Sequence, residues 1–204
     1  IGFLPLLHMG IPGWSAEEAV DEDCRYTRLP DGGWEWPLWK WKSSILQESG
    51  CAYGKFLGSK AAFISREWWP DFCNYRRSVY PYPEERSIEE AILDTLKTEG
   101  SLTTRELRAA CGFTGPKMRS RSDTYLTRLE MGGYSVTKDF IYPHDRHGRE
   151  YGWGWSLLTT PENLFGRETC PPGRTPSESR ARILARLRKI LPDVPEKIYD
   201  SLLK

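Results

Sequence analysis

Residues 87–158 read SIEEAILDTLKTEGSLTTRELRAACGFTGPKMRSRSDTYLTRLEMGGYSVTKDFIYPHDRHGREYGWGWSLL. The stretch opens with Ser87-Ile-Glu-Glu90, which has the spacing of a capping box, and an apolar stripe continues to Gly100. Thr103-Thr-Arg-Glu106 repeats this spacing and begins a short helix that we expect to end at Gly112. The pattern therefore predicts two consecutive helices, each with its own start and stop signals.

Gly115-Pro116 is expected to begin a third helix that continues to Gly132-Gly133. The residues that follow predict a strand over 134–142, a polar loop over 143–148 and a second strand over 150–158. Three helices followed by a β-hairpin is the element order of a winged helix, which is typical of nucleic-acid-binding proteins. We therefore predict a winged-helix unit in this part of the chain.

An aromatic block lies upstream, between residues 34 and 77. Residues 37–46 predict a helix that begins at a proline, with Leu38, Trp41 and Ile45 on one apolar face. Two strand-like segments follow the helix and predict a hairpin, because a Gly-containing pair of residues separates them. Helix and hairpin in so short a stretch indicate a small α+β module.

Hydroxyl side chains mark three further helix starts. Ser65 is placed to cap a helix over residues 66–78, and Ser15-Ala-Glu-Glu18 has the capping-box spacing for a short helix near the beginning. Thr175-Pro-Ser-Glu178 caps a C-terminal helix, and Pro195 begins a last short one. The basic residues of the long C-terminal helix fit either contact with a phosphate backbone or an ordinary solvated face.

Tyr80-Pro-Tyr-Pro83 is expected to be extended, because proline disfavours helix in the residue before it. We therefore predict an α+β fold of two small modules, tandem winged-helix-like, with a C-terminal helical extension. The expected boundaries are 1–79 for the N-terminal α+β module, 80–86 for the linker, 87–165 for the winged-helix domain and 166–204 for the C-terminal helical extension.

The overall charge is nearly balanced, with 29 Lys and Arg against 28 Asp and Glu and a formal net charge of +1. A protein that coats nucleic acid without specificity is usually far more basic, so any binding must come from a local basic face. Nine Trp and ten Tyr are a heavy aromatic load. Such rings suit cores, ligand walls and platforms for stacked bases.

The five cysteines are odd in number and form no CxxC pair, which argues against a disulfide framework and a structural zinc site. They are Cys24, Cys51, Cys73, Cys111 and Cys170. No apolar run approaches the roughly 18 residues of a membrane span, and we predict a cytoplasmic protein with reduced thiols and no membrane contact. Residue 1 is Ile rather than Met, so we expect the natural chain to begin upstream.

The candidate nucleic-acid-binding residues lie on the third predicted helix and in the loop of the hairpin. They are Lys117, Arg119, Arg121, Thr124 and Arg128 on the helix, and Arg146 and Arg149 in the loop. The second helix of a helix-turn-helix enters the major groove, where arginine pairs with guanine edges or phosphates. His144, Asp145 and His147 also stand in the loop, but neighbouring loop ligands make a weak metal site, so we expect neither metal nor cofactor.

Nothing in the chain selects a catalytic residue. The sequence contains no HExxH, GxSxG, P-loop or GxGxxG motif, and no spacing singles out a Cys–His pair. A base-excision enzyme needs a polar or acidic group that positions water, and a pocket for the extruded base. The aromatic residues suit such a pocket, but no carboxylate stands out as the partner.

Three segments resemble proteins of the AlkZ-related family. They are Ala52-Tyr-Gly-Lys-Phe56, Ala62-Phe-Ile-Ser65 and Glu67-Trp-Trp-Pro-Asp-Phe72, followed by the predicted winged helix. These proteins are relatives of the AlkZ (YcaQ-type) glycosylases, which unhook alkylated bases and interstrand crosslinks. The resemblance covers much of residues 1–165, and it implies tandem winged-helix modules that hold DNA in a central channel.

The sequence departs from this family at the catalytic motif. The glycosylases use Gln-x-Gln or Gln-x-Asp to position water, whereas Gln47 is the only glutamine here and is followed by Glu48 and Ser49. No catalytic residue is carried over, and the resemblance supports DNA binding more than base excision. Our leading hypothesis is a protein that binds duplex DNA. The alternatives are a divergent glycosylase that uses an acid in place of the motif, and an adaptor whose winged helix binds a protein.

Overall fold

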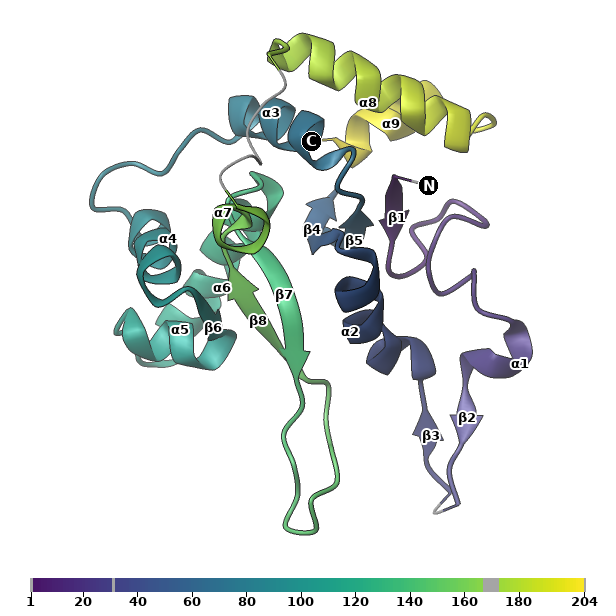
Figure 1. Ribbon diagram of the computed structural model, residues 1–204, viewed down its shortest axis with the longest axis vertical. Coiled ribbons are helices and arrows are strands. Elements are labelled where there is room, and N and C mark those ends of the chain that lie inside the picture. Colours follow the sequence, from purple (N-terminus) through teal and green to yellow (C-terminus); the bar gives the residue numbers. More distant parts are fainter. Residues whose placement is uncertain (1, 31, 167–172, 204) are drawn as a thin grey trace.

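The computed structural model describes residues 2–30, 32–166 and 173–203. Small antiparallel sheets are flanked by helices, so the chain is α+β as predicted (Figure 1). Ile1 and the predicted thiol of Cys170 lie outside the described residues.

The first sheet is built around the predicted hairpin of β4 (Ala52–Leu57) and β5 (Lys60–Ile64). Gly58 and Ser59 both have positive φ, at 53° and 60°, as a tight two-residue hairpin turn requires. Strand β1 (Phe3–Pro5), which was not predicted, pairs antiparallel with the other edge of β5. Three residues are too few to show the alternation by which a strand is recognised in sequence.

Helix α2 (Pro37–Ser49) forms as predicted, but its buried face differs from the predicted one. Leu38, Lys42 and Leu46 are buried, whereas Trp41 is exposed. The prediction for Trp41 was wrong because it ranked residues by apolarity alone. The long stem of Lys42 enters the core instead, and its ammonium group lies against aromatic rings.

Helix α3 (Trp69–Val79) begins three residues later than predicted, and Ser65 does not cap it. Pro70 occupies the first turn, where its missing N–H costs nothing; further inside a helix it would clash with the preceding turn. Residues 15–18 form a turn rather than the expected helix, although Ser15 Oγ accepts a hydrogen bond from the Glu18 N–H at 3.1 Å. The capping bond is present there, but no amphipathic stretch follows it.

The elements predicted for residues 87–158 occur in the predicted order. They are α4 (Ile88–Glu99), α5 (Thr104–Ala110), α6 (Pro116–Met131), β7 (Val136–Ile141) and β8 (Trp155–Thr159). An unpredicted strand, β6 (Ser101–Thr103), pairs with β8 and gives a sheet of order β6-β8-β7. Strand β8 begins at residue 155 rather than 150, because Gly152 and Gly154 have positive φ and keep the preceding residues in a loop.

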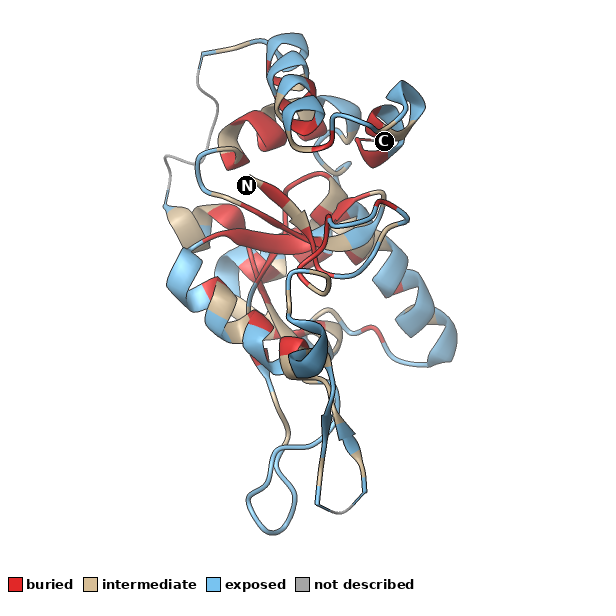
Figure 2. Ribbon diagram, turned by 90° about the vertical axis from the view of Figure 1, so that its right-hand side faces the viewer, coloured by how far each residue is buried: buried red, intermediate tan, exposed pale blue. Residues whose placement is uncertain are grey.

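The remaining elements are α1 (Glu22–Arg25), the short hairpin of β2 (Thr27–Arg28) and β3 (Trp34–Glu35), α7 (Pro161–Phe165), α8 (Pro176–Ile190) and α9 (Glu196–Leu202). Helix α8 begins at the predicted cap Thr175 and lies across α3, so the C-terminal helices cover the N-terminal sheet (Figure 1). Buried residues concentrate in the sheets and on inner helix faces, whereas the β2–β3 hairpin and the β7–β8 loop are largely exposed (Figure 2). In the described part of the chain, no helix combines the length and apolarity needed to cross a membrane.

Candidate nucleic-acid interface

Helix α6 carries a stripe of cationic and polar side chains along its solvent face. Successive helical residues are about 100° apart, so positions separated by four, seven and eleven share a face. The exposed residues on this stripe are Lys117, Arg121, Thr124 and Arg128. Leu126 and Leu129 lie on the opposite face, in the core. The structure therefore brings together four of the five residues predicted on this helix.

Arg119 is the exception. It is exposed near the helix start, but it lies about 200° around the helix axis from Lys117 and so on another side. The stripe itself is partly neutralised and ordered by its neighbours. Arg128 forms an ion pair with Glu89 of α4 at 3.4 Å, and Arg121 Nη2 donates to the Tyr125 hydroxyl at 3.2 Å. Lys117 and Arg121 thus supply most of the net positive charge of the stripe.

Arg146 and Arg149 are exposed in the loop between β7 and β8, which projects from one end of the molecule (Figure 1). The Asp145 carboxylate organises this loop by accepting the N–H groups of His147 and Arg149 at 2.7 and 3.0 Å. Arg149 also lies 3.9 Å from that carboxylate, and Arg146 Nε donates to His147 Nε2 at 3.0 Å. The polar groups of the loop tip are used to shape the loop, and within the described ranges no cluster of potential metal ligands gathers.

Strand β4 positions helix α6 through the segment Tyr53-Gly54-Lys55. Lys55 Nζ donates to Thr127 Oγ1 on α6 at 2.9 Å. Glu130, on the same helix, is buried against the strand, and this burial raises its carboxyl pKa to about 7 although Lys55 acts in the opposite direction. A Cβ on Gly54 would lie 3.2 Å from Glu130 Oε1, so glycine lets the helix approach. This recognisable piece of sequence therefore serves to orient the cationic stripe.

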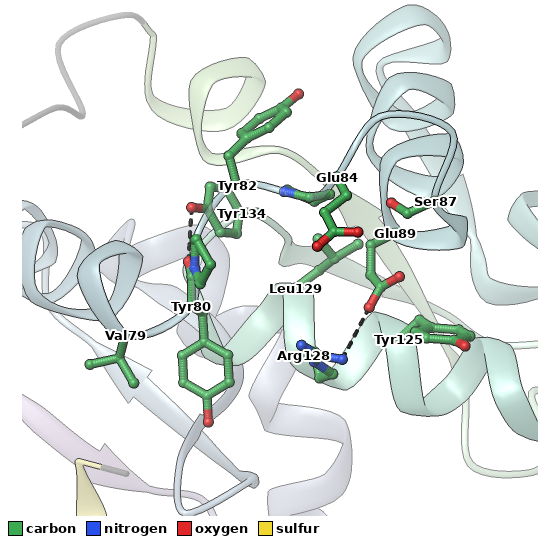
Figure 3. Close-up of a pocket in the computed structure, with 12 residues that line it drawn as sticks. Val79, Tyr80, Tyr82, Glu84, Ser87, Glu89, Tyr125, Arg128, Leu129 and Tyr134 are labelled. Atoms are coloured by element: carbon green, nitrogen blue, oxygen red, sulfur yellow. Dashed lines mark hydrogen bonds and ion pairs between the residues drawn. The ribbon is translucent and has the colours of Figure 1, made fainter.

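A polar pocket of about 420 Å³ lies beside the stripe, between the 80–86 segment and helices α4 and α6. Tyr80 and Tyr82 form one wall, and Tyr125 and Arg128 lie across from them (Figure 3). The Arg128 guanidinium reaches the Glu89 carboxylate inside the pocket, as Figure 3 shows. Sequence reasoning missed this pocket, because its walls come from segments that only the fold brings together.

A second hollow, of about 360 Å³, lies between the β2–β3 hairpin and the β7–β8 loop. Trp34, Trp36 and Trp39 line it, together with Trp153 from the loop. Trp68, from the same aromatic block, instead packs against the core beside Phe3, with ring centroids 5.7 Å apart. The aromatic block predicted for residues 34–77 therefore divides between an open groove and a closed core.

Lys42 lies behind this groove. Its ammonium nitrogen is 3.4 Å from the ring centroid of Trp39 and 3.8 Å from that of Phe140. Burial lowers the pKa of Lys42 to about 7, while the two ring faces favour its charged form. The amine is 1% exposed, so it acts on the groove through the position of Trp39 rather than by contact with a ligand.

Comparison with known proteins places these features in a family. The family model for AlkZ-related proteins matches residues 1–204, which is the whole chain. Among solved structures, the DNA glycosylase AlkZ of Streptomyces sahachiroi is similar at 12% sequence identity and a TM-score of 0.45. The match covers 69% of this chain and 40% of that glycosylase, so this chain spans well under two thirds of its length. No curated protein matches the chain.

Proposed function

The chain belongs to the AlkZ-related family, and from this premise we propose that it binds duplex DNA through a winged helix formed by residues 87–158. The cationic stripe of α6 is the observation that carries the proposal. In this arrangement α6 lies in the major groove, with Lys117 and Arg121 against phosphates or base edges. Thr124 and Arg128 follow along the same face, and Arg146 and Arg149 reach the backbone from the projecting loop.

The character of the stripe favours DNA over a protein partner. A protein-binding winged helix needs an apolar or evenly charged contact face, whereas α6 presents three cations and a hydroxyl group along its solvent face. The surface lacks the charge density of a nonspecific coating protein, because acidic groups such as Glu89 lie close by. Binding that depends on a small number of phosphate contacts follows from this arrangement.

The test is duplex binding measured by fluorescence anisotropy over a range of salt concentrations. Five cations in contact with phosphates give a slope of log affinity against log salt of roughly −4 to −5. The triple variant Lys117→Ala/Arg121→Ala/Arg128→Ala is expected to weaken binding at least about tenfold and to reduce the slope by about three. Arg119→Ala is the matched control, because it removes one cation from the same helix on another side. Equal loss in the control and the triple variant would refute the stripe as the interface.

Base excision is a second candidate function, and the pocket beside Arg128 favours it. An extruded base needs aromatic or apolar walls, and hydrolysis at the sugar carbon needs a group that orients water. Tyr80, Tyr82 and Tyr125 supply the walls. Glu84 lies in the same pocket and is exposed, whereas the carboxylate of Glu89 is occupied by Arg128. We therefore assign Glu84 the water-orienting role in this second candidate.

This candidate is tested by incubating the protein with duplexes that carry different alkylated bases and measuring the free base by chromatography. Release that is lost in Glu84→Gln and kept in Glu85→Gln supports excision at this pocket. Glu85 is a fair control because it is exposed one residue away and does not line the pocket. Absence of release from every lesion tested rules excision out and leaves duplex binding as the function.

A further inference from the structure

The groove between the β2–β3 hairpin and the β7–β8 loop is separate from the α6 stripe. Both segments project from the same end of the molecule in two perpendicular views (Figures 1 and 2). The loop is held against helix α2, which follows the hairpin, because Trp39 Nε1 donates to the Trp153 carbonyl at 2.6 Å and the Tyr142 hydroxyl donates to the Trp39 carbonyl at 2.7 Å. The groove between the loop and the hairpin has a volume of about 360 Å³.

The groove has a rigid aromatic floor and exposed aromatic walls. Trp36 and Trp39 stack with ring centroids 5.4 Å apart and planes 23° from parallel, and Trp153 meets the Trp39 ring edge-on at 5.2 Å. On the walls, Trp34 is 69% exposed, Trp153 68% and Tyr151 57%. Burial of large aromatic side chains usually stabilises a fold strongly, so exposed rings are uncommon. A group of exposed aromatic rings on one surface therefore indicates a ligand site.

The chemistry of the walls selects the ligand. Leu29 is the single aliphatic side chain among the described residues that line the groove, so the surface presents flat π faces rather than an apolar protein-binding patch. Flat aromatic faces bind unpaired nucleobases by stacking, without regard to base identity. Arg28 is exposed on β2 directly opposite Trp34 in register, and the loop that forms the other wall carries Arg146 and Arg149. None of these cations lines the groove itself, where Lys40 is the single cation among the described lining residues.

We propose that this groove binds an unpaired stretch of nucleic acid, with bases stacked on Trp34 and Trp153. Acidic and basic groups are nearly balanced here: Glu35 and Glu150 line the groove with Lys40, and the Lys40–Glu35 ion pair measures 2.5 Å. Affinity in the groove therefore comes mainly from stacking rather than from the release of counterions. This single-strand site complements the proposed duplex site without depending on it.

The experiment compares a labelled oligothymidine of about twelve nucleotides with an abasic strand of the same length. Both strands carry the same phosphates, and only the first carries bases. The oligothymidine is expected to bind at least about tenfold more tightly, with little loss between about 50 and about 200 mM salt. Trp34→Ala/Trp153→Ala is expected to remove this preference, whereas Trp41→Ala, an exposed tryptophan outside the groove, leaves it intact. Thermal unfolding confirms that each variant is folded.

Each other outcome overturns the proposal. Equal binding of both strands would show that the protein contacts phosphates alone. Equal loss of oligothymidine affinity in the Trp34/Trp153 and Trp41 variants would show that the groove is not the binding site. If neither strand binds, the groove is better explained as a protein-binding site. Sedimentation at rising protein concentration then shows whether the bound protein is a second copy of this chain. The α6 triple variant distinguishes the two proposals, because it is expected to lose affinity for duplex DNA and to keep its affinity for the oligothymidine.

Discussion

Gly54 lies where strand β4 meets helix α6, and its missing side chain makes room for two neighbours. A Cβ at this position would lie 2.7 Å from Phe56 Cε1 and 3.2 Å from Glu130 Oε1. Both neighbours are buried and have little room to move. Gly54→Ala is therefore expected to lower the free energy of unfolding by about 1–3 kcal/mol, measured by urea denaturation. Adding Phe56→Leu relieves the closest contact, so the double variant should lose less than the sum of the two single losses.

Because of Lys42, the free energy of unfolding is expected to depend on pH above neutrality. The folded chain releases the Lys42 proton near pH 7, whereas the unfolded chain holds it until about 10.5. The unfolded state thus binds more protons between these values, so stability rises with pH across this window and the burial penalty is fully present below it. Denaturant unfolding at several pH values is expected to show this rise in the native protein and to lose it in Lys42→Met. An unchanged rise in the variant would assign the effect to another group.

Single residues also show what the sequence could and could not predict. Hydrophobicity ranked Trp41 above Lys42 for the buried face of α2, and the structure reverses the order. The reversal depends on Phe140, which lies nearly a hundred residues away and offers its ring face to the ammonium group. By contrast, Lys117 and Arg121 share a face because of helical spacing alone, so part of the candidate interface is visible in the sequence.

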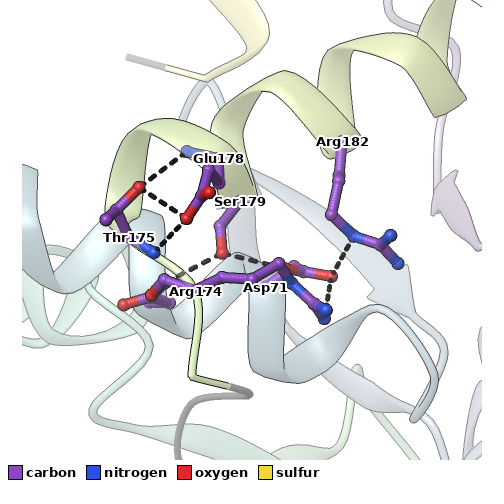
Figure 4. Close-up of polar contacts among 7 residues, drawn as sticks. Asp71, Arg174, Thr175, Glu178, Ser179 and Arg182 are labelled. Atoms are coloured by element: carbon purple, nitrogen blue, oxygen red, sulfur yellow. Dashed lines mark hydrogen bonds and ion pairs between the residues drawn. The ribbon is translucent and has the colours of Figure 1, made fainter.

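At the scale of elements, one buried carboxylate joins α3 to α8 in addition to the apolar packing between the two helices. Asp71 is 1% exposed; Arg174 binds it at 2.9 and 3.2 Å, and Ser179 and Arg182 donate to it at 2.8 and 3.0 Å (Figure 4). Burial alone raises the pKa of this carboxyl, but the hydrogen bonds from Arg174, Ser179 and Arg182 bring it below its ordinary value. The charge is therefore held at neutral pH by Ser179 and Arg182 of α8 and by Arg174, which lies just before that helix.

Asp71→Asn is expected to cost about 2–4 kcal/mol at pH 7, because it leaves two arginines beside an uncharged buried group. Since the folded pKa is lowered, the contribution of Asp71 is complete at neutral pH and is lost as the pH falls below about 4. The difference between variant and native protein should therefore shrink in acid. Glu196→Gln provides the control, because its ion pair with Arg188 is exposed and screened by solvent, so its loss is expected to change stability little.

Elements with strong local signals were predicted well. The capping boxes at Thr103 and Thr175 begin α5 and α8 with both reciprocal hydrogen bonds in place. Strands β1 and β6 were missed because each has three residues and exists only through a partner strand far along the chain. The groove was missed for the same reason, since its walls come from residues near 34 and near 153. Helix caps and turns can therefore be predicted from neighbouring residues, whereas pairing between distant segments cannot.

At the scale of the molecule, strand β7 joins the parts of the chain. Val136 belongs to the apolar cluster that contains the first sheet and helices α8 and α9. Phe140 belongs to the cluster beneath α2, and Tyr134, just before the strand, belongs to the cluster of α4, α5 and α6. The division into modules at residues 80–86 stays a prediction about organisation, but the packing of β7 argues that the modules do not unfold separately.

This coupling is tested by weakening one cluster and measuring another. Leu93 is 2% exposed in the cluster of α4, α5 and α6, and Leu93→Ala is expected to cost about 2–5 kcal/mol. If the chain unfolds as one unit, the protection of β4 amides against hydrogen exchange should fall by the same free energy as the global stability. This holds although no residue of β4 belongs to the cluster that contains Leu93. Leu187→Ala, in the cluster of α8, should act reciprocally on amides of α4. Unchanged exchange in β4 would show that the modules fold independently, and the groove, whose walls come from both modules, would then depend on how they dock.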